Sequence, residues 1–161
     1  MSKAQEVMEI PIYQSREDNY EKQYKWVAKQ VQEFLLNNDF IVPRYNAYST
    51  NSIYLKIDCG LCKSIRISDH RGKGYLRYTY NILKDVNSSY SVVDNGVLRY
   101  YVSFDNWKEI TCKIMECRED LIGKYGSNWY SKEVNKRIKN FKSMGKCFWT
   151  DAYLVKKGEG K

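Results

Sequence analysis

Polar side chains at every second position mark the part of this sequence that could support chemistry. Residues 64–70 alternate isoleucine with polar residues and include the only histidine of the chain. Because residues two apart in a strand lie on one face, Arg66, Ser68 and His70 share a side and the isoleucines share the other. A histidine base, a hydroxyl group and an arginine that binds phosphate are groups used in metal-independent cleavage of RNA.

The preceding segment brings further polar groups to the same face. Residues 53–57 also alternate apolar and polar side chains, which predicts a strand paired with residues 64–68. If the apolar residues of both strands share the core, the numbers of opposed residues must sum to an even value. A tight loop then pairs Tyr54 with Arg66, and a register shifted by two residues stays open. Either register collects the residues that we call the hairpin polar face: Ser52, Tyr54, Arg66, Ser68 and His70.

Two roles for the hairpin polar face follow from its residue types. In an RNA-cleaving site, His70 would be the base, Arg66 would hold the phosphate and Tyr54 would lie beside them. A metal-free ribonuclease also needs a separate acid, however, and the chain has one histidine. We therefore expect no catalytic residues here, but a polar network that fixes the strand register or a contact surface for a partner.

The cysteines do not form a convincing metal site. Cys59 and Cys62 have the C-x-x-C spacing of a zinc knuckle, but a structural zinc needs two more ligands. Cys112 and Cys117 are separated by about 140° around a helix, so they cannot both face one ion. We expect reduced, packed thiols, no metal and no cofactor.

Positive charge is concentrated in the last part of the chain. The formal net charge is +8; residues 1–127 contribute 18 − 16 = +2, and residues 128–161 contribute 9 − 3 = +6. Such asymmetry is typical of a protein that binds nucleic acid or an acidic surface, although a solvated helix face is the simpler alternative. Our candidates for contact with a partner lie in this segment: Lys132, Lys136, Arg137, Lys139 and Lys142.

Tyrosines are abundant and interleave with arginines in the predicted strand region. Such surfaces can stack bases and hold phosphates, although tyrosine in strands more often simply packs. The residues that suggest this surface are Tyr45, Tyr48, Tyr75, Tyr78, Tyr80, Tyr90, Tyr100 and Tyr101, with Arg44, Arg77 and Arg99.

The hydrophobic periodicity predicts the elements that position these groups. A helix with one apolar stripe is expected from Ser15 to Asn37, and two helices are expected after Asp105 and Ser127. The predicted strands are residues 53–57, 64–68, 75–83, two within 92–104 around a turn, and a last one in 147–155.

This order predicts a single-domain α+β fold in which an N-terminal helix and two C-terminal helices accompany an antiparallel sheet of four to five strands. We divide the chain into an N-terminal arm (1–14), an α+β core (15–126) and a basic C-terminal helix and tail packed on the core (127–161). Since the sequence contains neither a membrane-spanning run nor a signal-peptide pattern, we expect a cytoplasmic protein.

The order Ser52-x-Tyr54 followed by Ile-Arg-Ile-Ser-Asp-His at 65–70 resembles a signature of small phage-encoded anti-CRISPR proteins, among them broad-spectrum inhibitors of Cas9. The resemblance covers residues 30–83, and the matching positions are those of the hairpin polar face. It implies an inhibitor in the bacterial host cytoplasm that binds a Cas effector nuclease or its guide-RNA complex. Residues 1–14 lack the long basic arm of the family, and the basic segment after residue 127 is additional.

From the residues and the resemblance together, we expect a non-enzymatic anti-CRISPR inhibitor that blocks nucleic-acid binding or cleavage by a Cas effector. The alternative is an RNA-binding or metal-independent RNA-cleaving protein of phage or mobile-element origin. The sequence leaves open which effector is bound, which step is blocked and the oligomeric state.

Overall fold

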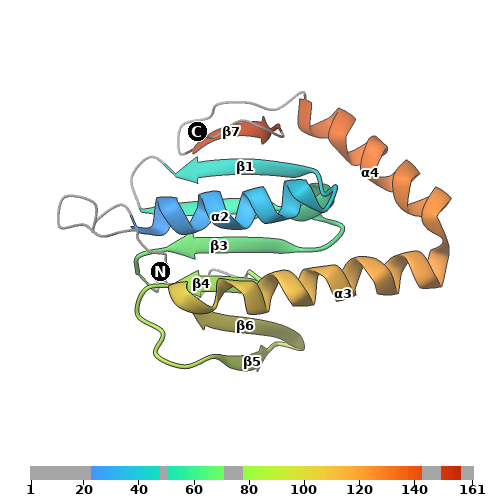
Figure 1. Ribbon diagram of the computed structural model, residues 1–161. Coiled ribbons are helices and arrows are strands. Elements are labelled where there is room, and N and C mark those ends of the chain that lie inside the picture. Colours follow the sequence, from blue (N-terminus) through green and yellow to red (C-terminus); the bar gives the residue numbers. More distant parts are fainter. Residues whose placement is uncertain (1–22, 48–50, 71–77, 143–149, 157–161) are drawn as a thin grey trace, which may run out of the picture.

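The structure, a computed structural model, describes residues 23–47, 51–70, 78–142 and 150–156. Its described elements form one seven-stranded sheet with α2 and α3 lying across one face (Figure 1). The chain is thus an α+β single domain, as predicted. None of the helices in these ranges is long and apolar enough to cross a lipid bilayer.

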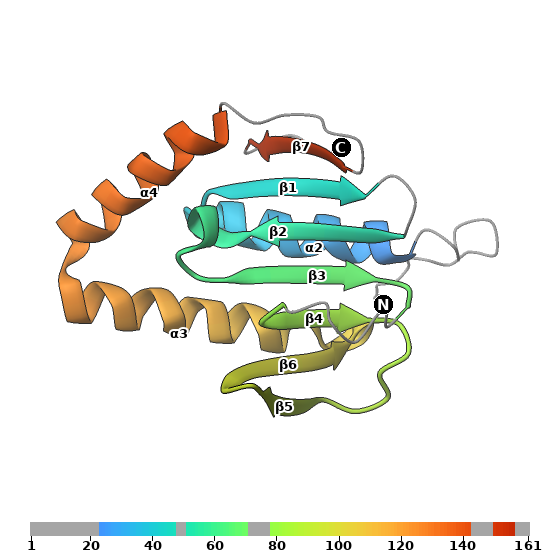
Figure 2. The ribbon, with the colours of Figure 1, turned by 180° about the vertical axis from the view of Figure 1, so that it is seen from behind.

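Three α-helices and seven strands make up the fold. The helices are α2 (Gln23–Asn37), α3 (Trp107–Tyr125) and α4 (Ser127–Lys142), and the short 3-10 turns are η2 (Ile57–Gly60) and η3 (Phe104–Asn106). The strands are β1 (Val42–Ala47), β2 (Ser52–Lys56), β3 (Ser64–Ser68), β4 (Tyr80–Leu83), β5 (Tyr90–Asp94), β6 (Val97–Ser103) and β7 (Thr150–Val155). They lie in the order β5-β6-β4-β3-β2-β1-β7 (Figure 2).

The predicted number of four to five strands was too low, and the predicted antiparallel pairing is wrong only at β4. β4 runs parallel to both of its neighbours, β3 and β6. All four residues of β4 are buried, the pattern of a strand covered on both faces, which is typical of parallel pairing. The predicted strand at 75–83 is described only from residue 78, and its paired part is Tyr80–Leu83.

The hairpin register was predicted correctly in its first form. Ser52 lies opposite Ser68, and Tyr54 lies opposite Arg66. The turn signal within 92–104 is likewise confirmed, since Asn95 and Gly96 both have positive φ and join β5 to β6. Two positive φ values are the mark of a type I′ turn, which matches the twist of the strands it joins.

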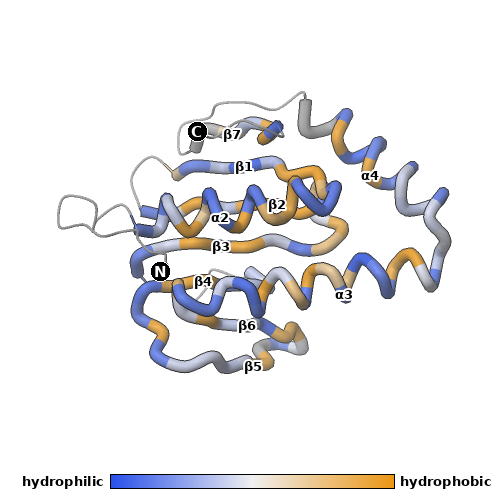
Figure 3. Tube along the Cα trace, in the orientation of Figure 1, coloured by the Kyte–Doolittle hydropathy of each residue, from blue (hydrophilic) through white to orange (hydrophobic). Residues whose placement is uncertain are grey.

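The core lies between the sheet and the helices α2 and α3. The apolar stripe predicted for the first helix is buried at Tyr24, Val27, Val31 and Leu35, while its predicted start at Ser15 lies outside the described residues. Facing it are fully buried residues of the central strands: Ile53, Leu55, Ile65, Ile67 and Ile82. Each such side chain stabilises the fold by about 1.5–3 kcal/mol relative to exposure. Figure 3 shows the apolar stretches of β3 and β4 under the helices.

The last part of the chain contributes to the sheet as well as to its surface. β7 pairs along its whole length with β1. The helix α4 leaves the end of α3 at Gly126 and packs against η2 (Figure 1). The predicted arm at 1–14 lies outside the described residues.

Candidate partner-binding surface

The hairpin polar face lies on the side of the sheet opposite α2, because the isoleucines between its members face that helix. Ser52, Arg66 and Ser68 are buried there, while Tyr54 and His70 are half-buried. The Ser52 hydroxyl donates to Ser68 Oγ at 2.9 Å, and the Ser68 hydroxyl donates to the carbonyl of Asn51 at 2.8 Å. The two serines therefore connect the paired strands through their side chains.

Arg66 is held within the same network. Only 2% of its surface is exposed, and its Nη2 donates to the carbonyl of His70 at 3.2 Å and to Ser52 Oγ at 3.5 Å. The backbone N–H of His70 in turn donates to Ser68 Oγ at 3.3 Å. Thus His70 joins the network through its backbone. A guanidinium this deeply buried does not offer its donors to a phosphate, so the arrangement favours a structural role.

The predicted tyrosine surface is divided between the two faces of the sheet. Tyr80 and Tyr100 stack on each other at 5.9 Å on the helix side, where Lys113 lies 4.3 Å from the Tyr100 ring. On the opposite side, Tyr54 packs on Tyr78 with ring centroids 4.9 Å apart. Tyr48, Tyr75 and Arg77 lie outside the described residues. The described tyrosines of this set therefore lie on both faces of the sheet rather than on one.

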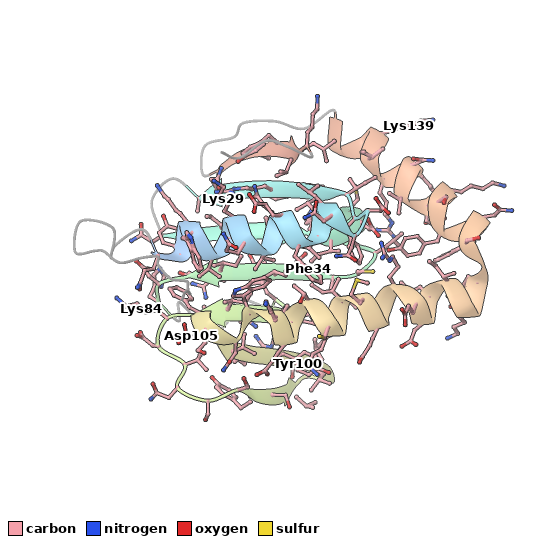
Figure 4. The ribbon with its side chains drawn as sticks, viewed as in Figure 1. Lys29, Phe34, Lys84, Tyr100, Asp105 and Lys139 are labelled. Atoms are coloured by element: carbon pink, nitrogen blue, oxygen red, sulfur yellow. The ribbon has the colours of Figure 1, made fainter. Side chains whose placement is uncertain are left out.

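The exposed lysines of α4 form a separate feature, which we call the basic stripe: Lys132, Lys136 and Lys139. These positions fall within about 60° around the helix, about 160° from the buried Tyr130. The Lys136 side chain is 73% exposed. In Figure 4, Lys139 lies at the periphery of the molecule. The structure therefore directs the stripe away from the body of the protein.

The other two candidates on α4 differ from the stripe. Arg137 lies about 140° from Lys132 around the helix, on the side that faces η2. Its Nη1 would be 4.0 Å from a Cβ at Gly60, and its Nε lies 3.9 Å from Glu133 Oε1. The side chain of Lys142 lies outside the described residues. Arg137 thus packs against η2 in addition to contributing to the surface of α4.

A buried polar cluster fixes α4 on the core. Tyr130 donates its hydroxyl proton to Asp58 Oδ2, while Asp58 Oδ1 accepts from the N–H of Ile41 at 2.8 Å. Burial raises the pKa of Asp58, and the hydrogen bonds from Ile41 and Tyr130 and the charge of Arg118 oppose that rise. Burial and the bond to Asp58 also raise the pKa of Tyr130. These bonds connect η2 to α4 and to the residue before β1.

Sequence reasoning missed this cluster. Asp58 has a φ of 51°, and its neighbours Cys59 and Gly60 also have positive φ. An aspartate followed closely by glycine between two strands is a turn signal, so the loop itself was detectable. Nothing in the sequence indicates that its carboxyl group pairs with Tyr130, which lies 72 residues later.

Two of the cysteines meet at the edge of this cluster. Since Tyr130 gives its only hydroxyl proton to Asp58, its oxygen can act only as an acceptor toward Cys62 Sγ, 3.1 Å away. The Cys62 thiol has one proton, so it donates either to this oxygen or to Cys117, and the hydrogen bond to Cys117 lowers the pKa of Cys117 to about 7 against the opposing effect of burial. The positive charge of Lys63 acts in the same direction. Among the described residues, no three His, Cys, Asp or Glu side chains gather to hold a metal ion.

Alkylation tests the state of Cys117. We expect the iodoacetamide reaction at Cys117 to accelerate as pH rises through about 7, because the thiolate is the reactive form. Cys62→Val removes the hydrogen-bond donor and should move this acceleration to higher pH. Peptide mass spectrometry measures the rate of alkylation at the half-buried Cys117, and the rate at the exposed Cys112 is the internal reference. An unchanged profile in Cys62→Val would contradict the assigned hydrogen bond.

Comparison with protein-family models, curated proteins and solved structures finds no match to this chain. The residues on its own surface are therefore the basis for inferring its function. Two features stand out in the described residues: a hairpin polar face whose arginine and serines are buried, and a basic stripe on a firmly anchored helix. The first suits a scaffold, and the second suits contact with an acidic partner.

Proposed function

We propose that this protein is a phage-type anti-CRISPR inhibitor that binds a Cas effector nuclease or its guide-RNA complex and blocks nucleic-acid binding or cleavage without catalysing a reaction. The observation that carries the proposal is the outward-facing basic stripe of α4. The resemblance of the hairpin to phage anti-CRISPR proteins supplies the class of target. In this proposal, the hairpin polar face is the scaffold and the protein acts in the cytoplasm of a bacterial host.

The charge distribution supports α4 as the contact element. The α4 sequence carries five Lys or Arg against one Glu, which gives +4, whereas α3 carries four of each sign. Lys132 and Lys139 are separated by about 10 Å along the helix. Neighbouring lysines of the stripe are only about 4.5–6 Å apart along the axis, which is less than the Debye length of about 8 Å at physiological ionic strength, so the stripe acts as one patch of charge.

The anchoring of α4 supports a preorganised contact. The bond from Tyr130 to Asp58 and the burial of Val134 fix the face of the helix opposite the stripe. A fixed helix loses less conformational freedom on binding than a flexible basic tail. Lysines contact phosphates without reading sequence, so guide RNA bound to its effector is a suitable acidic partner.

Charge reversal tests the proposal. The variant Lys132→Glu/Lys136→Glu/Lys139→Glu is expected to bind a Cas effector–guide complex about tenfold more weakly or worse at low salt, and to show a smaller salt dependence of binding. The matched control reverses three exposed lysines on other elements, Lys25, Lys56 and Lys108, and has the same net charge. We expect the control to stay within about twofold of the wild type. Equal losses of binding affinity in both variants would contradict the assignment of the basic stripe as the contact site.

The RNA-cleaving alternative predicts a different outcome in the same experiment. If the protein cleaves RNA through His70, the guide RNA should shorten on incubation, and His70→Ala should abolish both cleavage and inhibition. The burial of Arg66 supports the opposite expectation. We expect intact RNA on a denaturing gel and full inhibition by His70→Ala.

A further inference from the structure

Among the described residues, the outer strand β5 is an edge that lacks several of the usual protections against pairing. It forms one end of the described sheet (Figure 2). Its sequence, Tyr-Ser-Val-Val-Asp, contains no lysine and no proline, and it pairs with β6 in unbroken register without a bulge. Edge strands in monomeric proteins commonly use one of these devices to prevent strands of other chains from adding to the sheet.

The hairpin of β5 and β6 also exposes large apolar side chains on both of its faces. Val93 is 67% exposed, and Val92, Val97 and Leu98 are exposed as well. Val93 lies opposite Leu98 on one face, and Val92 lies opposite Arg99 on the other. Two of the four exposed aliphatic residues lie on each face of this short hairpin, and apolar exposure of this kind is found at protein contacts.

The turn determines which backbone groups of β5 point outward. Asp94 and Val97 flank the type I′ turn and form a hydrogen-bonded pair, so the pairs alternate from there along the hairpin. The N–H and C=O groups of Val92 therefore point toward β6. Those of Ser91 and Val93 point away from it, to a side where no described strand lies.

We infer that β5 binds β5 of a second copy of this chain, antiparallel and around a two-fold axis at Val92. In that register, the outward groups of Ser91 meet those of Val93 in the second copy, which gives four hydrogen bonds. Val92 then lies opposite Val92 of the second copy as a close, non-hydrogen-bonded pair. The two sheets become one sheet of fourteen strands, counting seven from each copy.

The charge distribution favours a second copy as the occupant. The chain carries +8, and two such chains repel wherever their basic surfaces meet. Residues 86–98 contain a single charged residue, Asp94, so the copies can approach here without opposing lysines. The register is also self-complementary, which is the requirement for an interface that closes as a dimer.

Sedimentation velocity of the full chain tests the inference. From about 1 to about 300 μM, we expect the wild type to shift from one chain to two, because a short edge contact gives modest affinity. Ser91→Pro removes an outward N–H that β6 does not need, and should raise the dissociation constant by about tenfold or more. Ser91→Ala keeps the N–H and is the matched control, expected to dimerise as the wild type does.

A second variant keeps the test decisive if Ser91→Pro fails to fold. Val93→Lys places a charge on the exposed edge and should also weaken the dimer by about tenfold, and thermal melting verifies that both variants are folded. Three results would overturn the inference: a wild type that stays monomeric, a folded edge variant that dimerises unchanged, or open-ended polymers. Polymers would indicate head-to-tail pairing of β5 with β7.

Discussion

Arg66→Ala is expected to lower the free energy of unfolding by about 3–4 kcal/mol, the largest effect of any single substitution proposed for this protein. The guanidinium is buried and donates to Ser52 Oγ and to the carbonyl of His70. Alanine leaves these acceptors without that donor in a buried setting and also leaves a cavity. Urea unfolding monitored by circular dichroism provides the measurement.

Lys56→Ala is the control for Arg66→Ala. Lys56 lies exposed at the end of β2 with its ammonium group 5.1 Å from the Tyr45 ring, so its replacement should change the free energy of unfolding by no more than about 1 kcal/mol. A loss below about 1 kcal/mol in Arg66→Ala would mean that the guanidinium is solvated in solution. That result would restore Arg66 as a candidate for phosphate binding and would favour the RNA-cleaving alternative.

Asp58→Ala is expected to lower the free energy of unfolding by about 3 kcal/mol, because it deprives two buried donors of their acceptor. These donors are the N–H of Ile41 and the hydroxyl of Tyr130. Alanine is also strained at the positive φ of this position. Asp39→Ala is the matched control, since Asp39 has a φ of 67° but is exposed, and it should lose only about 1 kcal/mol. Equal losses in the two variants would contradict the proposed role of the carboxyl group.

The pH dependence of stability provides a second readout at Asp58. Because burial raises its pKa in the folded protein, the folded state binds this proton more tightly than the unfolded chain does. The free energy of unfolding of the wild type relative to Asp58→Asn should therefore be highest below the ordinary carboxyl pKa of about 3.9 and fall as pH rises through the higher folded value. A relative stability that increases with pH in that window would reverse the assigned direction.

Local patterns were sufficient to predict much of the fold. The apolar stripe of α2, the pairing of Tyr54 with Arg66 and the turn at Asn95 and Gly96 depend on residues close in sequence, where periodicity and turn chemistry operate. The partition of the hairpin into an isoleucine side and a polar side follows from the same alternation. For this reason alternation alone predicts that Ser52, Tyr54, Arg66 and Ser68 share one face of the hairpin, as their pairing shows.

The choice of distant neighbours could not be predicted in this way. β1 includes Pro43, which masked its strand pattern, and its pairing with β7 joins segments that no local signal connects. The insertion of β6 beside β4, with β5 at the outside, likewise depends on packing of the whole sheet. The bond between Asp58 and Tyr130 is a contact of the same kind. Alternation identifies strands and their faces, but it does not identify their partners.

The pairing of β1 with β7 has a consequence for synthesis of the protein. β1 ends at Ala47 and β7 begins at Thr150, so 150 − 47 = 103 positions separate them. At a translation rate of about 5–20 residues per second, β7 is synthesised roughly 5–20 s after β1. The outer edge of β1 lacks this partner strand until then. During this interval the nascent chain has an open template for strand addition next to a nearly complete core. Timely folding of this protein thus depends on β7, the last of the described strands to leave the ribosome.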